Sequence, residues 1–282
     1  MNRASTLLCG LLILINAAMP GVAQTKGVAT FGGLKNLEFI KDFYNGGTGS
    51  LGSGPGKDFP LQFTGNAQAI VSAAKRGSGN FSNNPGGYPV MFFQTGTNVV
   101  VNAPNGISVS TWFYYSTLQP ATATIFAGQN ATGNILASIT LTPNNTGCTG
   151  YKLCVWSPAG MALTAAAGSI RFAGTANNLA IGTIHMGQKM PSTITLTSSL
   201  NPSELGQPVT ITATLLSTAG AIPSGTVTFK SANQILGQVS TVQGVASISV
   251  STLPLGSSTI SATFKSDNFV TTSAKLIQTV NP

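Results

Sequence analysis

Apolar and hydroxyl side chains alternate along the last third of the chain. Between residues 209 and 215 every second residue is apolar, and threonine occupies the positions between them. This period of two places the apolar side chains on one face of a β-strand and the threonines on the other. The same alternation recurs at residues 227–229, 246–250 and 260–264. The pattern therefore predicts several short, half-buried strands.

Turn-forming residues separate these runs at the positions where a strand must reverse. They are Pro202, Gly206, Pro223, Gly225, Gly237, Gly244, Pro254, Gly256, Asp267 and Asn268. Short strands at this spacing, without a helical period between them, indicate an all-β sandwich.

Residues 192–282 resemble the bacterial Ig-like repeat domain in several motifs that follow the family's order. These are Pro-Ser-Gly-Thr-Val-Thr-Phe at 223–229, Ile-Leu-Gly at 235–237, Gly-Val-Ala at 244–246, and Leu-Gly at 255–256 before Ile-Ser-Ala-Thr-Phe at 260–264. Ser266 stands where the family usually has a glycine. The resemblance implies an Ig-like β-sandwich of the kind found in surface and secreted bacterial proteins.

A second domain is expected over residues 27–188. Strand-like alternation occurs over residues 59–63, 107–115 and 135–141, and we also interpret residues 37–43 and 151–156 as strands. Glycine and asparagine turns separate these runs, and no helical stretch of useful length intervenes. The predicted fold class is all-β, with a jelly-roll-like β-sandwich followed by an Ig-like β-sandwich.

Several segments of the N-terminal domain are similar to an exported bacterial domain often found in proteins that bear a PEP-CTERM sorting tail. They are the glycine-rich run at 43–56, Gly-Asn-Phe at 79–81, Val-Met-Phe-Phe at 90–93, Phe-Tyr-Tyr-Ser at 113–116 and Gly-Ser-Ile-Arg-Phe at 168–172. That family has no agreed activity. Its members commonly carry aspartates in a last strand, whereas residues 179–184 hold no carboxylate. The sequence ends at Pro282 without a sorting tail, so we expect no membrane span in the mature chain.

Residues 1–23 predict a secretory signal peptide. Arg3 precedes an apolar run over residues 7–15, and Gly21 and Ala23 supply the small side chains that a signal peptidase reads. The apolar run is too short to span a bilayer comfortably. We therefore expect the mature chain to begin at Gln24 and to be secreted, either extracellular or at the cell surface of a bacterium.

Two cysteines, Cys148 and Cys154, remain after this cleavage. In an exported protein a disulfide is the usual outcome, and Gly147 and Gly150 permit the tight reversal that it needs. A structural zinc site is the alternative, but His185 is the only histidine that could complete it. We expect the disulfide, which closes a small loop and contributes about 2 kcal/mol.

Charge and composition exclude several classes of function. Charged residues make up 6% of the chain, and the net charge of +8 reflects a scarcity of acids rather than a basic cluster, so no nucleic-acid partner is expected. Neither a pair of glycosidase carboxylates nor a Ser-His-Asp triad is evident among five acids and one histidine. The glycine-rich loop at 45–56 lacks the Gly-Lys-Ser/Thr ending of a nucleotide-binding loop. We expect neither enzymatic activity nor a catalytic cofactor.

Two binding hypotheses remain. Asp42 and Asp58 flank the glycine-rich loop, and their carboxylates with loop carbonyls would suit a structural calcium ion, simple solvation of the loop being the alternative. Trp112, Tyr114 and Trp156 fall at alternate positions of two expected strands and would form a sugar-binding surface, unless their rings fill the space between sheets. The sequence thus predicts a structural or adhesive surface or matrix protein with glycan or protein partners. The alternative is a carbohydrate-binding protein.

Overall fold

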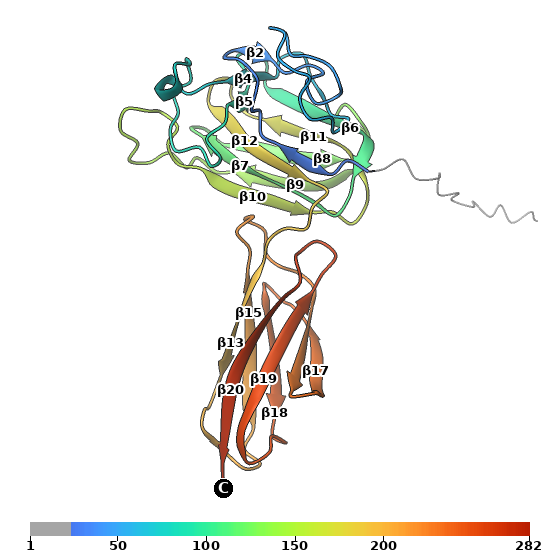
Figure 1. The fold of residues 1–282 in the computed structure, drawn as a ribbon, viewed down its shortest axis with the longest axis vertical. Helices are drawn as coiled ribbons and strands as arrows, with labels where there is room; N and C mark the ends of the chain where they lie inside the picture. The colour runs from blue at the N-terminus through green and yellow to red at the C-terminus, as the bar shows by residue number, and fades with distance from the viewer. Residues whose placement is uncertain (1–23) are drawn as a thin grey trace, which may run out of the picture.

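The computed structural model describes residues 24–282, which form two successive β-sandwiches (Figure 1). Among these residues the only helical element is a short 3-10 helix, Ala73–Lys75. No helix in the described part of the chain is long and apolar enough to cross a membrane. Four sheets pack in two pairs around separate cores, which confirms the predicted all-β fold class. The predicted signal peptide lies outside the described residues.

The N-terminal unit, residues 27–186, contains two antiparallel sheets, which we call sheets I and II. Sheet I has the order β10 (Ser157–Ala162), β7 (Ser110–Thr117), β12 (Leu179–Met186), β5 (Val90–Phe92), β4 (Gln68–Ile70) and β2 (Glu38–Phe39), and β1 (Gly27–Ala29) also pairs with β12. Sheet II has the order β3 (Gln62–Phe63), β6 (Asn98–Ile107), β11 (Ala167–Ala173), β8 (Ala121–Phe126) and β9 (Ile135–Leu141).

Side chains from the inner faces of sheets I and II form one core. Phe113 of β7 and Phe172 of β11 are fully buried and meet edge to face, with ring centroids 4.9 Å apart. Burying such a side chain stabilises the fold by roughly 1.5–3 kcal/mol, so this pair holds the two sheets together. The period of two along β7 then places Trp112 and Tyr114 on the outer face of sheet I.

The single strand expected over residues 107–115 is wrong, because the structure divides it between two sheets. β6 of sheet II ends at Ile107, and β7 of sheet I begins at Ser110. Between them Val109 has a φ of 69°. This left-handed conformation is rare for a β-branched residue and interrupts the extended backbone. The chain crosses here from one sheet to the other.

The strand expected over residues 37–43 shrinks to two residues, β2. Leu37 and Lys41 adopt positive φ values of 61° and 47°, which end the extended conformation on either side. The chain then turns into the glycine-rich loop. Of the alternating residues that suggested a strand, Leu37 and Phe39 are exposed and only Phe43 enters the core. Ile40, outside that alternation, is buried beside it.

The strand expected over residues 151–156 is also wrong, and a loop takes its place. The disulfide between Cys148 and Cys154 is confirmed, with the two Cα atoms 5.7 Å apart. It closes the chain on itself, so only one isolated bridge forms, between Phe81 and Leu153. We call residues 145–156 the disulfide loop, and β10 follows directly after it.

The C-terminal unit, residues 190–281, contains a three-stranded sheet III and a five-stranded sheet IV. Sheet III has the order β13 (Thr193–Ser198), β15 (Val209–Leu216) and β18 (Val245–Val250). Sheet IV has the order β14 (Ser203–Glu204), β20 (Thr272–Asn281), β19 (Gly256–Lys265), β16 (Thr226–Ser231) and β17 (Gln234–Ser240). The predicted alternation is confirmed, since Ile211, Phe229 and Phe264 lie fully buried between the sheets.

The segment between the two units is packed against both of them. Met190 is fully buried in the core of the C-terminal unit, its N–H donates to the carbonyl of Asn268 at 2.8 Å, and its carbonyl accepts from Val270 at 2.9 Å. A Cβ built on Gly160 of β10 would lie 2.7 Å from the sulfur of Met190. Trp112 packs against the same core. The β10 edge of sheet I therefore rests on the C-terminal unit (Figure 1).

A fragment of residues 189–282 should unfold cooperatively on heating, and it should be more stable than a fragment of residues 192–282. The shorter fragment lacks Met190, and the loss of a buried methionine side chain costs about 2–5 kcal/mol. Thermal unfolding followed by circular dichroism measures the difference. A longer fragment without a cooperative transition would contradict an independently folding C-terminal unit.

Candidate functional site

The outer face of sheet I carries two of the three aromatic residues expected to bind sugar. Trp112 stacks on His185 with ring centroids 3.5 Å apart, because the two residues are paired in register on β7 and β12. Tyr114 meets Trp112 edge on at 5.9 Å. All three side chains are half-buried, and Trp112 also packs against the C-terminal unit. Trp112 therefore helps to pack the N-terminal unit against the C-terminal unit. Less of its ring surface is free than the sugar-binding hypothesis assumes.

Trp156 lies in a smaller apolar cluster at the start of β10. Its ring meets Phe81 edge on at 6.0 Å, and its indole N–H donates to the carbonyl of Ser82 at 2.8 Å. Gly182 separates it from Tyr114, since a Cβ built there would lie 3.4 Å from Tyr114 and 3.6 Å from Trp156. The three aromatic residues are thus close in space but do not form a single flat surface.

A hollow of about 300 Å³ opens beside this cluster, between the segment after β4 and the disulfide loop. Two tyrosines contribute to its wall, and we call it the tyrosine hollow. Tyr88 is 46% exposed, and Tyr151 on the disulfide loop is half-buried. The other lining residues that matter below are Lys75, Phe81, Asn83 and Asn84. Aromatic rings, amides and one ammonium group therefore converge on one small concave surface.

Hydrogen bonds fix residues 81–89, which form one wall of the hollow. The hydroxyl of Ser72 donates to the carbonyl of Phe81 at 2.6 Å, and the side-chain amide of Asn84 donates to the carbonyl of Tyr88 at 2.8 Å. The side-chain oxygen of Asn84 is buried and accepts no hydrogen bond from any described residue. Buried acceptors without a partner are uncommon, and this oxygen faces Gly182 of β12, where a built Cβ would lie 3.0 Å from it.

Asn145 fixes the opposite wall, the disulfide loop. Its side-chain oxygen accepts the N–H groups of Cys154 at 2.7 Å and Val155 at 3.0 Å. Its side-chain nitrogen donates to the hydroxyl of Ser116 at 2.9 Å and the carbonyl of Thr117 at 3.2 Å. One half-buried asparagine therefore connects the loop to the end of β7.

Sequence reasoning missed both Tyr88 and Asn145. Tyr88 stands in the run Gly-Gly-Tyr-Pro, and an aromatic residue within such a turn signal was the available hint of an exposed ring. Asn145 gave no hint, because its partners Ser116 and Thr117 lie 29 and 28 positions away. Only the fold brings them together.

Asp42 and Asp58 lie against the same glycine turn, as the calcium hypothesis requires, and both are exposed. A Cβ built on Gly47 would lie 2.7 Å from the Cβ of Asp42, and one on Gly46 would lie 3.8 Å from Oδ2 of Asp58. In residues 24–282 no group of three His, Cys, Asp or Glu side chains is close enough to hold a metal ion. Calcium binding at this turn stays a prediction.

Glu38 is fully buried at the base of the glycine-rich loop. Its carboxylate accepts the N–H groups of Lys35 at 2.7 Å, Leu51 at 2.9 Å and Ser53 at 3.1 Å, and the hydroxyl of Ser53 at 2.5 Å. Burial acts to raise the pKa of this carboxyl, but the hydrogen bonds from Ser53, Lys35 and Leu51 together hold the pKa below its ordinary value of 4.5. The arrangement gives Glu38 a structural role in shaping the loop.

His185 is a neutral packing partner of Trp112. Burial of its ring lowers the pKa to about 4, from an ordinary value of 6.5, since removal from water disfavours the imidazolium. A depressed pKa in the folded state means that the stability is fully present above pH 6.5 and falls as the pH drops toward 4. His185 therefore opposes folding in acid.

The single histidine should titrate in the folded protein with a pKa near 4. Two-dimensional NMR of the imidazole carbons and nitrogens over pH 3–8 measures this value without ambiguity, because only one histidine is present. The unfolded protein in denaturant supplies the control, with a pKa near 6.5. A pKa near 6.5 in the folded state would contradict the stacked, water-poor position of the ring.

Residues 196–281 match the sequence model of the bacterial Ig-like domain (group 3). This range begins within β13 and covers the rest of the C-terminal unit, so the resemblance of this unit is confirmed. No curated protein matches the chain.

Distant likenesses exist among solved structures. One is to the fibronectin(III)-like modules of CbhA from Clostridium thermocellum, with 14% identity over 65% of this chain and 85% of that one, at a TM-score of 0.26. A putative membrane anchored protein from Corynebacterium diphtheriae gives 14% identity over 68% of this chain and 53% of that one, at a TM-score of 0.24. A beta-glycosidase from Bacteroides vulgatus gives 11% identity over 89% of this chain and 33% of that one, at a TM-score of 0.24. At these scores the likenesses carry no argument about activity.

Proposed function

We propose that this protein is an exported, non-enzymatic adhesive protein of the bacterial surface or matrix, and that its N-terminal unit contacts glycans. The Ig-like unit serves as a stalk in this proposal. Its strands run along the long axis of the molecule, with the N-terminal unit at one end and the C-terminus at the other (Figure 1). The packed junction at Met190 supports a fixed presentation of the N-terminal unit.

The tyrosine hollow is the observation that carries the glycan contact. A sugar ring has apolar faces that pack on aromatic rings and hydroxyl groups that need hydrogen-bond partners. Tyr88 and Tyr151 offer the rings, while Asn83 and Lys75 offer polar groups beside them. The hollow is small, so a single site would bind weakly, and an adhesive protein gains strength from many simultaneous contacts.

The non-enzymatic part of the proposal rests on how the acids and the histidine are used. A glycosidase needs two carboxyl groups that face each other across a cleft. The carboxylate of Glu38 accepts hydrogen bonds from the glycine-rich loop. Asp42 and Asp58 are exposed beside that loop, outside the tyrosine hollow. His185 is stacked on Trp112 with a pKa near 4. None of these groups lines the hollow.

The test is binding of the mature chain to an array of cell-wall and matrix polysaccharides. Tyr88→Ala and Tyr151→Ala should each weaken binding at least about tenfold, which corresponds to about 1.4 kcal/mol. Phe39→Ala is the matched control, because Phe39 is an exposed aromatic residue outside the hollow. Equal binding by all three variants would remove the hollow from the proposal. Failure of the unmodified protein to bind any polysaccharide would refute the glycan contact itself.

A further inference from the structure

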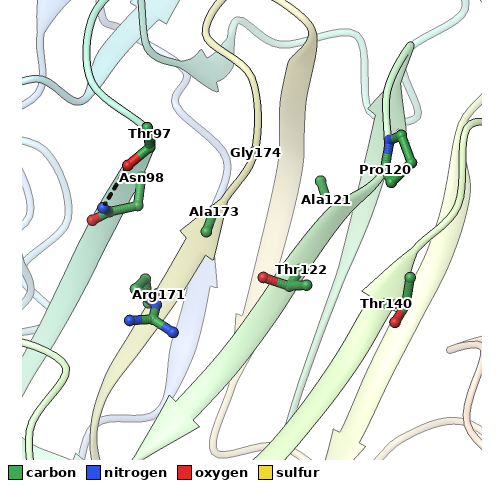
Figure 2. A pocket seen from close by; sticks show the side chains of 9 residues that line it. All are labelled: Thr97, Asn98, Pro120, Ala121, Thr122, Thr140, Arg171, Ala173 and Gly174. Atoms are coloured by element: carbon green, nitrogen blue, oxygen red, sulfur yellow. Dashed lines mark hydrogen bonds between the residues drawn. The ribbon is translucent and has the colours of Figure 1, made fainter.

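A second groove lies on the opposite side of the N-terminal unit, on the outer face of sheet II (Figure 2). Arg171 stands in the middle of β11, between Val100 of β6 and Thr124 of β8 in register. In the next row Ala173 lies between Asn98 and Thr122. We call the surface lined by Thr97, Asn98, Thr122, Thr140, Arg171 and Ala173 the arginine groove, and its volume is about 460 Å³.

The guanidinium of Arg171 has no polar partner in the described part of the chain. It makes no hydrogen bond there, and its Nε is buried and unsatisfied. The sequence contains no aspartate or glutamate between Asp58 and Glu204, so no carboxylate on the flanking strands can pair with it. Its one specific contact is with the ring of Phe126, whose centroid lies 5.0 Å from Cζ.

The neighbouring polar groups on the strands beside β11 are satisfied. The hydroxyls of Thr124 and Ser138 are 3.0 Å apart, and the side chains of Asn102 and Asn130 bond to each other at 2.8 Å. Arg171 is therefore the exception on this face of the sheet. A half-buried cation without a partner is costly to the fold, since burial of a charge is normally offset by pairing. Such a cost suggests that the partner comes from outside the chain.

A small side chain keeps the groove open beside this cation. Ala173 leaves space where a larger residue would cover Arg171, and Thr97, Thr122 and Thr140 place hydroxyls around that space (Figure 2). The guanidinium fork matches a carboxylate with two parallel N–H···O bonds. Threonine hydroxyls both donate to and accept from the hydroxyls of a sugar ring.

We propose that the arginine groove binds a uronate residue of an acidic polysaccharide, with the carboxylate on Arg171 and the sugar hydroxyls on the surrounding threonines. The open groove fits a chain that continues past the site on both sides. An acidic peptide would satisfy Arg171 equally well, but it offers the surrounding hydroxyls only its backbone amides, whereas a sugar ring carries several hydroxyls close to its carboxylate. This site is separate from the tyrosine hollow and does not depend on it.

The experiment measures binding of the mature chain to polygalacturonate, to the same polymer with its carboxyl groups methyl-esterified, and to polyglutamate. We expect binding to polygalacturonate, at least tenfold weaker binding to the esterified polymer, and weaker binding to polyglutamate. Arg171→Gln should lower the affinity for polygalacturonate at least tenfold, with Arg171→Lys intermediate. Lys275→Gln removes the same charge from an exposed position on β20 and should leave binding unchanged.

Ala173→Leu supplies a second variant that fills the groove and leaves Arg171 in place, so it should also abolish binding. The Arg171→Gln protein should keep or raise its unfolding midpoint, because the lost group has no polar partner in the fold and its buried Nε is unsatisfied. Binding of Arg171→Gln within twofold of the unmodified protein would overturn the proposal. Equal loss with Lys275→Gln, equal binding of the esterified polymer, or tighter binding of polyglutamate would overturn it as well. If Tyr88→Ala abolished polygalacturonate binding and Arg171→Gln did not, the polymer would bind at the tyrosine hollow, and the proposal would be overturned.

Discussion

Replacing Glu38 by alanine should cost the N-terminal unit about 3 kcal/mol or more, since each buried donor left without a partner costs about 1–3 kcal/mol. Three N–H groups and one hydroxyl lose their acceptor when this carboxylate is removed. Glu38→Gln should cost less than alanine, because it keeps one oxygen but turns an NH₂ group toward donors. Thermal and urea unfolding measure both effects.

Asp42→Ala is the matched control for this prediction. Asp42 is a neighbouring acid on the same loop, but it is exposed, and a surface substitution of this kind usually changes stability by less than about 0.5 kcal/mol. A similar loss for Asp42→Ala and Glu38→Ala would mean that loop charge, rather than the buried hydrogen bonds, matters. A negligible loss for Glu38→Ala would contradict the structural role of the carboxylate.

The same carboxylate should make folding sensitive to acid. Because the pKa of Glu38 lies below 4.5 in the folded protein, its contribution to stability is complete above that value and is lost as the pH falls through the folded pKa. His185 acts in the same direction between pH 6.5 and about 4. The free energy of unfolding should therefore fall steadily from pH 7 to pH 4. In Glu38→Gln the decline below pH 4.5 should be shallower, while the part due to His185 remains.

Replacing Asn145 by alanine should destabilise the disulfide loop and the tyrosine hollow together. Its amide makes two accepted and two donated hydrogen bonds between the loop and the end of β7, and their combined loss costs about 2–4 kcal/mol. Glycan binding should weaken as well, because Tyr151 loses its support on that wall. Unfolding and binding measured on one preparation separate these two effects.

Asn145→Asp is the informative partner of that variant. Aspartate keeps the acceptor for the N–H groups of Cys154 and Val155 but replaces the donor with an oxygen that faces the carbonyl of Thr117. It should be at least as destabilising as alanine at neutral pH, and less so when protonated in acid. An Asp variant as stable as the unmodified protein at pH 7 would contradict the donor role of Asn145.

The alternation of the sequence was enough to predict four strands of the C-terminal unit, β15, β16, β18 and β19, because each of them keeps one face in the core. Ile211, Phe229 and Phe264 follow that rule without exception. The N-terminal unit departs from it where residues other than glycine adopt positive φ. Val109 is such a residue, and a valine side chain does not predict a left-handed backbone. The pattern therefore joined two strands that belong to different sheets.

Candidate site residues were harder to predict than strands, because their roles depend on contacts between distant segments. The sequence left open whether Trp112 faces outward or lies between the sheets; it lies on an outer face, yet the C-terminal unit covers part of it. Tyr88 and Tyr151 belong to loops more than sixty positions apart, which the bridge between Phe81 and Leu153 brings side by side. A sequence shows which side chains exist, whereas the hollow results from how two loops pack.

The central claim is that the protein binds polysaccharide without changing it. The most direct measurement incubates the mature chain with each polysaccharide that it binds and then determines the length of the recovered polymer and the reducing ends released. We predict that bound polymer is recovered at full length, at pH 5 and at pH 7, with no reducing ends above those of a protein-free control. Shortening of the polymer by the unmodified protein, but not by Asp42→Asn or Asp58→Asn, would contradict the account and identify a glycosidase.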